Sequence, residues 1–235
     1  MGPHPYGWLI LLHLVLFVFW LGGDLGVFYS SRFVIDPKLD PAARVTALNI
    51  MSGLDLAPKI CLVLFLPSGV TLMATAPHGA ELFGVGLFPG WSVAAIWVFS
   101  AIWLALTVIA HRTHGRVATV YRADLAIRGL VIAGMAGAGG YALIAAEPFG
   151  VTTNPKWLGA KILLYTAAIA AGLGIRITLR PFGAAFGELL TTGSSDRIEH
   201  TLRRSVDGCL PYVWTIWGSV LAAAALGVFK PGAQL

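Results

Sequence analysis

The sequence contains little charge. Asp, Glu, Lys and Arg make up 11% of its 235 residues, against about 25% in an ordinary soluble domain. Hydrophobic residues make up 57% of the chain, and the mean hydropathy is +0.79. This composition excludes a disordered chain and a coiled coil, since both need abundant charged residues. It also excludes most soluble folds, because so many apolar side chains need a boundary other than water.

Cysteine and the common catalytic motifs are also scarce or missing. The two cysteines, Cys61 and Cys209, lie in or beside apolar runs, so a disulfide framework is not indicated. The chain has no Walker loop, no dinucleotide-binding glycine motif, no HExxH and no cluster of histidine boxes. The net charge of +5 does not indicate a nucleic-acid partner, because the basic residues form small groups between long apolar runs.

Long apolar runs dominate what is present. A spanning helix needs about 20 mostly apolar residues, and six stretches reach that length. The first lacks a basic leader, since no Lys or Arg precedes Arg32, and is interpreted as a retained span. We therefore predict an all-α integral membrane protein, a single domain over residues 1–235 built as a six-transmembrane-helix bundle, with spans at approximately 7–29, 57–76, 91–111, 126–146, 157–177 and 209–229.

The basic residues predict the orientation of this bundle. They gather in the first, third and fifth connections, as Arg32, Lys38 and Arg44, then Arg112, Arg116 and Arg122, then Arg180, Arg197, Arg203 and Arg204. Loops rich in Lys and Arg stay in the cytoplasm. Both termini are therefore expected to be periplasmic, in a bacterial inner membrane.

Two further segments carry local predictions. The run of small residues at 134–140, GMAGAGG, allows close approach of helices and predicts a packing helix at the centre of the bundle. In the last connection, Asp196 followed by Glu199 resembles a helix start within the charged segment 194–206. We expect a short solvated helix on the membrane surface there.

Ionisable residues inside apolar runs are costly, so each is a functional candidate by default. They are His13, Asp24, Lys59, His111, Arg128 and Lys161. The predicted topology places His13 and Lys161 in the outer half of the membrane and the others near the inner surface. His13 and Asp24 share one helix face with Trp20, and this face is too polar to contact lipid.

A neutral imidazole in a helical bundle is a typical ligand of haem iron, and a nearby cation offsets the propionate charge. His13 with Lys161 meets that requirement, and His111 with Arg128 forms a second candidate haem site. The two histidines lie toward opposite ends of the span, too far apart to bind one iron. Other interpretations stay open. His13 can be a hydrogen-bonded packing residue, and Asp24 with Lys59 can be a charge pair that fixes helix register. His111 and His114 can hold a metal, although a third ligand is missing.

Three strings carry a family resemblance over about a third of the chain: LLHLVLFVFWLGGDLGVFYSSRF, KWLGAKILLYTAAIAAGLGIR and LRRSVDGCL. They resemble segments of the bacterial CopD-like and HemJ-like membrane proteins. The HemJ type implies a haem-binding oxidase of protoporphyrinogen with functional positions at His13, Arg32 and Lys161. The CopD type implies copper handling. The sequence departs from the HemJ pattern at Gly159, where that family carries a histidine, and that type also has fewer spans.

These observations lead to one expected function and two alternatives. We expect a protein that binds haem b and carries out electron transfer or oxidation of a hydrophobic substrate, porphyrin-like or quinone-like. The expected catalytic residues are Asp24, Lys59 and Arg128; the cofactor-binding residues are His13, Arg32, His111 and Lys161; the metal ligands are His13, His111 and His114. The alternatives are a copper or small-ion permease of CopD type, with a polar path of His13, Asp24 and Lys59, and a non-enzymatic membrane partner protein. The expected partners are membrane lipid and the hydrophobic substrate or a redox partner, with a homo-oligomer left open.

Overall fold

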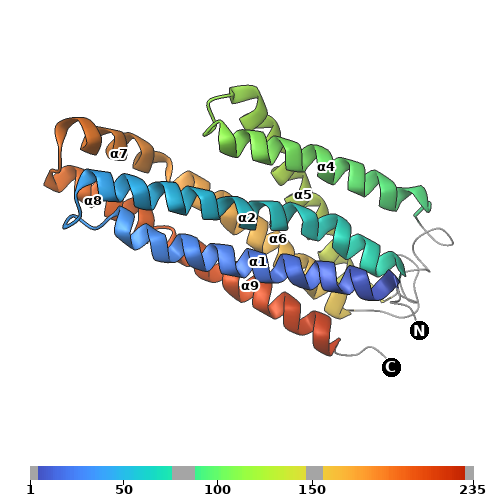
Figure 1. Ribbon diagram of the computed structural model, residues 1–235. Helices are drawn as coiled ribbons and strands as arrows, with labels where there is room; N and C mark the ends of the chain where they lie inside the picture. Colours follow the sequence, from blue (N-terminus) through green and yellow to red (C-terminus); the bar gives the residue numbers. More distant parts are fainter. Residues whose placement is uncertain (1–4, 76–87, 147–155, 231–235) are drawn as a thin grey trace.

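The computed structural model describes residues 5–75, 88–146 and 156–230, and within these ranges the long elements are all α-helices (Figure 1). They are α1 (Pro5–Val34), α2 (Pro41–Thr75), α4 (Trp91–Arg112), α5 (Ala118–Ile144), α6 (Lys156–Thr178), α7 (Arg180–Thr192), α8 (Asp196–Asp207) and α9 (Leu210–Phe229). The predicted all-α class is confirmed for the part of the chain that is described.

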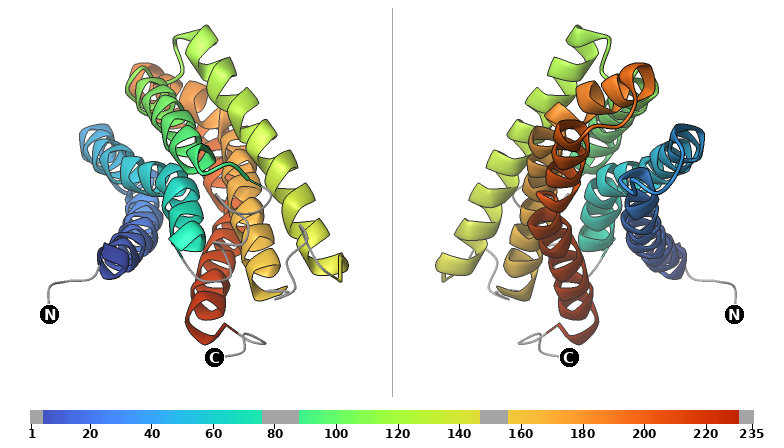
Figure 2. Two further views of the ribbon diagram at one scale, coloured as in Figure 1. Left: turned by 90° about the vertical axis from the view of Figure 1, so that its right-hand side faces the viewer. Right: turned by 90° about the vertical axis from the view of Figure 1, so that its left-hand side faces the viewer.

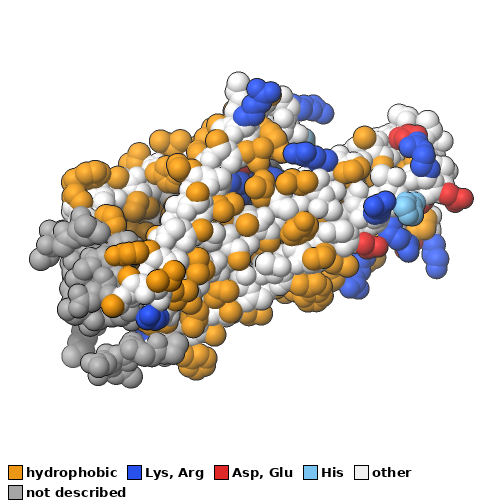
Figure 3. All heavy atoms as spheres, turned by 180° about the vertical axis from the view of Figure 1, so that it is seen from behind, with side chains coloured by type: hydrophobic (Ala, Val, Ile, Leu, Met, Phe, Trp, Pro, Cys, Tyr) orange, Lys and Arg blue, Asp and Glu red, His pale blue; other side chains and the backbone are white. Residues whose placement is uncertain are grey.

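Among the described residues, six helical segments are long and apolar enough to cross a membrane, as the sequence predicts. Their outer faces expose large apolar side chains such as Phe19, Val98, Ile102, Leu130 and Leu221. Figure 3 shows hydrophobic side chains over the body of the molecule, while most of the Lys and Arg side chains in this view gather towards one end. A surface this apolar needs a nonaqueous neighbour.

We call the end that holds the α1–α2 connection, the α4–α5 connection and helices α7 and α8 the basic end. Helix α1 begins and α9 ends at the opposite end (Figure 1).

The long helices pack as two groups that meet in a common core. Helix α1 lies along α2, and α6 lies along α9 and α5, while α4 contacts both α2 and α5 (Figure 2). Buried side chains from all six helices form the core, among them Trp20, Leu62, Trp103, Val131, Ile169 and Ile216. The contact between α1 and α9 is short, so the two groups are held together mainly through α4 and the core.

Helix α5 lies at the edge of the bundle (Figure 2), so the predicted central position is wrong. The small residues of α5 allow the close approach of only one neighbouring helix among the described elements, α6. A Cβ atom on Gly139 would come within 3.0 Å of Ile162 and Leu163 of α6, whereas Gly134 and Gly137 have nothing within 4 Å. The close approach is therefore a local contact of α5 with α6, because only one face of the glycine-rich run is covered.

Two helices begin earlier than their apolar runs predict. Helix α2 begins at Pro41, sixteen residues before the predicted span start at 57, and α5 begins at Ala118. Proline is favourable in the first helical turn, where its missing N–H has no partner to lose. The added turns of α2 are also packed, since Val45, Leu48 and Met51 contact a second hydrophobic core at the basic end.

Helices α7 and α8 form a hairpin that covers the basic end, and α7 was not predicted. Its Pro181 lies in the first turn, where proline starts a helix instead of breaking it. Helix α8 confirms the expected helix, with Ser195 as its N-cap. It is more than a solvated surface helix, because Ile198 and Leu202 are buried against the hairpin and the end of α1.

One ion pair anchors this hairpin to α2. Arg44 is 1% exposed, and its Nε donates a hydrogen bond of 2.8 Å to the Val34 carbonyl oxygen. Its Nη1 and Nη2 donate to the two carboxylate oxygens of Glu199, at 2.8 and 3.1 Å. A bidentate pair of this kind is strong and directional. It joins the ends of α1 and α2 to α8.

We predict that Arg44→Ala lowers the free energy of unfolding by about 2–4 kcal/mol, because it leaves a buried carbonyl and a carboxylate without their donor. The measurement is denaturant or thermal unfolding of the purified protein in detergent. Arg197→Ala is the matched control: Arg197 pairs with Glu188 in an exposed position, so its loss should cost less than about 1 kcal/mol. Equal effects of the two variants would contradict the anchoring role of Arg44.

Candidate functional site

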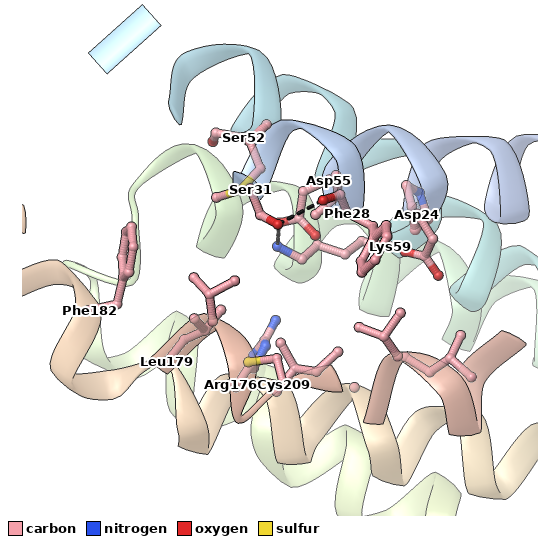
Figure 4. A pocket seen from close by; sticks show the side chains of 18 of the residues that line it. Asp24, Phe28, Ser31, Ser52, Asp55, Lys59, Arg176, Leu179, Phe182 and Cys209 are labelled. Carbon is pink, nitrogen blue, oxygen red and sulfur yellow. Dashed lines mark hydrogen bonds and ion pairs between the residues drawn. The ribbon is translucent and has the colours of Figure 1, made fainter. Parts of the chain in front are cut away.

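A cavity of about 350 Å³ lies between the α1 and α2 pair and the α6 and α9 pair, towards the basic end. Its walls are mostly apolar and include Val27, Leu62, Ile175, Val213 and Ile216. Phe182 of α7 and Val206 of α8 also line it, so the hairpin closes the cavity at the basic end. Figure 4 shows the labelled side chains of α1 and α2 facing those of the segment from α6 to α9 across this space.

Several ionisable side chains reach this apolar cavity. Three of them, Asp24, Lys59 and Arg128, are the predicted catalytic residues, and they come from α1, α2 and α5. Asp55 and Arg176 also line it and were not predicted. Apolar pockets with a few convergent polar groups are typical of small-molecule sites. The structure therefore assembles three of the four inner candidates, all except His111, around one space.

A chain of polar contacts leads from the cavity to the end of α4. Lys59 forms an ion pair with Asp55, one turn before it on α2. Lys59 Nζ also lies 3.3 Å from His111 Nδ1. An ammonium group only donates, so Nδ1 of His111 accepts and the ring proton is on Nε2. Lys59 therefore pairs with Asp55 of its own helix and not with Asp24, the partner considered from the sequence.

A second polar cluster lies behind the cavity wall, around the fully buried carboxylate of Asp124. Its Oδ1 accepts hydrogen bonds from Trp103 Nε1 at 3.2 Å and Thr107 Oγ1 at 2.8 Å. Its Oδ2 accepts from Arg128 Nε at 3.1 Å and Arg176 Nη1 at 2.7 Å. One carboxylate is therefore shared by two guanidinium groups, and one positive charge is left without a counterion in this cluster.

The outer candidates lie elsewhere. His13 Nδ1 is 2.9 Å from Ser68 Oγ, and this hydroxyl donates its own proton to the Leu64 carbonyl oxygen at 2.7 Å. Nδ1 of His13 is therefore the donor, which leaves Nε2 as an acceptor. A hydrogen bond from the second ring nitrogen is how proteins fix a metal-binding imidazole. His13 is thus held in the tautomer that an iron ligand requires, and the ring also packs edge-on against Phe65.

Lys161 of α6 lies within electrostatic range of His13, as the predicted outer group requires. Its ammonium is accommodated by Gly227 of α9, where a Cβ atom would approach Lys161 Nζ to 2.7 Å. Gly159, two residues earlier, packs on α5: a Cβ there would meet Ala142 at 3.0 Å and the Gly139 carbonyl oxygen at 3.2 Å. The histidine of the HemJ pattern therefore has no room at this position.

The remaining predicted residues do not join the His13 group. Arg32 lies nineteen residues after His13 on the same helix, which is about 28 Å at 1.5 Å per residue. Its guanidinium stacks on Phe28, a residue of the cavity wall, with 4.9 Å from Cζ to the ring centre. His114 lies in the turn after α4 with a φ of 48°. Within the described ranges, no group of three or more His, Cys, Asp or Glu could hold a metal ion.

The sequence prediction missed Asp55, Asp124 and Arg176 for one reason. Each lies just outside or at the edge of an apolar run, where α2, α5 and α6 extend beyond it. A signal for the first two was available: Asp55 precedes Lys59, and Asp124 precedes Arg128, by four residues. Opposite charges at this spacing meet on one helix face.

No model of a known protein family matches the chain, and neither does any curated protein or solved structure.

We predict that Asp124→Asn lowers the free energy of unfolding by about 3–5 kcal/mol, because the buried Arg128 and the partly buried Arg176 lose their shared counterion. Thr107→Val is the control, since it removes one hydrogen bond to the same carboxylate and should cost about 1–2 kcal/mol. Both are measured by unfolding in detergent. A loss for Asp124→Asn no larger than that for Thr107→Val would show that the charge is not needed to hold the cluster.

Proposed function

We propose that this protein is a multi-pass protein of the bacterial inner membrane that binds a hydrophobic small molecule in the cavity and takes part in its oxidation or in electron transfer. The cavity itself supports this most directly. Its apolar walls suit a molecule that partitions into lipid, and Asp24, Lys59 and Arg128 supply the few polar groups that orient such a ligand. Ionisable side chains at membrane depth are otherwise rare.

The proposed orientation places the basic end in the cytoplasm and both termini in the periplasm. The support is the distribution of Lys and Arg among the connections, which is what the positive-inside rule requires. In this orientation the cavity lies in the cytoplasmic half of the membrane, and His13 with Lys161 lies in the periplasmic half.

The redox part of the proposal rests on His13. We take a b-type haem as the cofactor, which His13 would bind through its free ring nitrogen while Lys161 would offset the charge of the propionates. The tautomer fixed by Ser68 and the space left by Gly227 for Lys161 support this assignment. When bound, haem supplies reversible one-electron transfer at its iron. His111 is less suited to the same role, because its Nδ1 is already occupied by Lys59.

The side chains around the cavity provide a route for protons. Oxidation of a hydrophobic molecule releases protons as well as electrons, and these have to leave an apolar site. Asp55 lines the cavity, Lys59 bonds to it, and His111 accepts from Lys59 at the end of α4. In this proposal the ligand gives a proton to the Asp55 carboxylate, Lys59 gives one to His111 and regains one from Asp55, and the electrons would go to the haem that His13 would hold. Arg128 positions the ligand.

An absorption spectrum of the purified protein, recorded before and after haem supplementation, tests the cofactor. We expect a Soret band for the wild-type protein and its loss in His13→Ala. Ser68→Ala should keep the band but weaken haem retention about 10- to 100-fold, because the imidazole loses its orienting hydrogen bond. His200→Ala, on the exposed face of α8, should behave as the wild type. A wild-type protein without a Soret band, even after supplementation, would reject the haem.

A further inference from the structure

One polar atom in the cavity wall has no partner. Arg128 is 3% exposed and lines the cavity; its guanidinium lies over the Trp103 ring, 5.7 Å from Cζ to the ring centre, and its Nη2 has no hydrogen-bond partner among the described residues. Buried polar atoms are almost always hydrogen-bonded, and the penalty for an unmade bond is largest for charged groups. The orphaned donor therefore indicates an acceptor that the chain itself does not provide.

The charges around the cavity indicate what kind of acceptor is missing. Lys59 is matched by Asp55, but Arg128 and Arg176 share the single carboxylate of Asp124. Asp24 brings the carboxylates around the cavity to three, equal to the three cations, so the positive excess is local to the side where these two arginines meet the cavity. Figure 4 shows Arg176 extending from the α6 side towards the opposite wall. Asp24 lies on that opposite wall, away from the two arginines, so an anion is favoured at the arginine side.

The rest of the cavity suits an apolar body. Val27 and Phe28 of α1 line it together with Val213 and Ile216 of α9. The seam between α1 and α9 is closed by an aromatic cluster, in which Phe28 lies 5.5 Å from Trp217 between ring centres. A volume of about 350 Å³ is near the lower limit of ligand pockets, which span about 300–1,000 Å³. One ring system or a short acyl chain suits it better than a large macrocycle.

From these observations we infer that the cavity binds an amphipathic small molecule through an anionic head, a carboxylate or a phosphate, held by Arg128 and Arg176. The apolar part of the ligand lies beside this seam, against Val27, Val213 and Ile216. Guanidinium groups are suited to this task because their N–H groups form charge-assisted, directional bonds to planar or tetrahedral oxyanions. This inference rests on the proposed function and names its ligand class: an acid with a hydrophobic body, in preference to a neutral quinone.

The test measures binding to the full-length protein in nanodiscs of zwitterionic lipid, with empty nanodiscs as the blank. The probes are radiolabelled decanoate, decyl phosphate and decanol, which share one chain and differ in the head. We expect saturable binding of decanoate or decyl phosphate at one site per chain, and binding of decanol at least about tenfold weaker, as the loss of a charge-assisted bond predicts. Which of the two anions binds more tightly tells a carboxylate ligand from a phosphate ligand.

Arg176→Gln removes one of the two cations and keeps Arg128 paired with Asp124. We expect it to weaken binding of the anionic probe about tenfold or more and to leave decanol binding unchanged, while Arg176→Lys restores part of the affinity. Arg180→Gln, one turn further along the chain and exposed, is the matched control and should bind as the wild type does.

The wild-type comparison alone can overturn the inference, whether or not a variant folds. If decanol binds as tightly as the anions, the anionic head is wrong, and the cavity remains a site for hydrophobic molecules. If none of the three probes binds above the blank, both the inference and the ligand cavity of the proposed function fail. Anion binding that is unchanged in Arg176→Gln would show that the head is held elsewhere.

Discussion

The interior of this protein depends on the hydrogen bonds and ion pairs of one buried carboxylate, that of Asp124. It joins α4, through Trp103 and Thr107, to Arg128 on its own helix and to Arg176 of α6. Two cations at this depth would be too costly without it. Because the carboxylate satisfies only part of their hydrogen-bonding capacity, both arginines also remain available to the cavity beside them. Structural pairing and a candidate binding surface thus arise from the same cluster.

The cavity exists because the α1–α2 pair and the α6–α9 pair contact each other over only a short part of their length. Helix α1 packs along α2, and α6 along α9, but α1 and α9 touch only briefly, and bulky side chains such as Phe28 and Trp217 fill that seam. At the basic end the hairpin of α7 and α8 covers the gap with its own hydrophobic core and is fixed by Arg44 and Glu199. The space left between these contacts is apolar in its walls and charged at few points, a combination that suits an amphipathic ligand.

Much of the framework could be predicted from the sequence, because apolar run length is a local property. The six runs identify the six long helices, and the costly residues inside them include Asp24, Lys59 and Arg128, which the structure gathers around one cavity. The edges of the runs were less informative. Pro41 and Pro181 lie in first helical turns outside the apolar runs, and Asp55 and Asp124 were missed because hydropathy alone ends a helix where its charges begin.

By itself the sequence determined the helical class, the number of long apolar helices and the short set of ionisable residues within them, since low charge and run length need no knowledge of neighbours. Only the tertiary structure decided which of these residues meet. It separates His13 and Lys161 from the cavity, pairs Lys59 with Asp55 and leaves Arg128 with an unused donor. Those outcomes depend on how helices far apart in the sequence pack, and on the fact that a buried charge must find its partner wherever packing provides one.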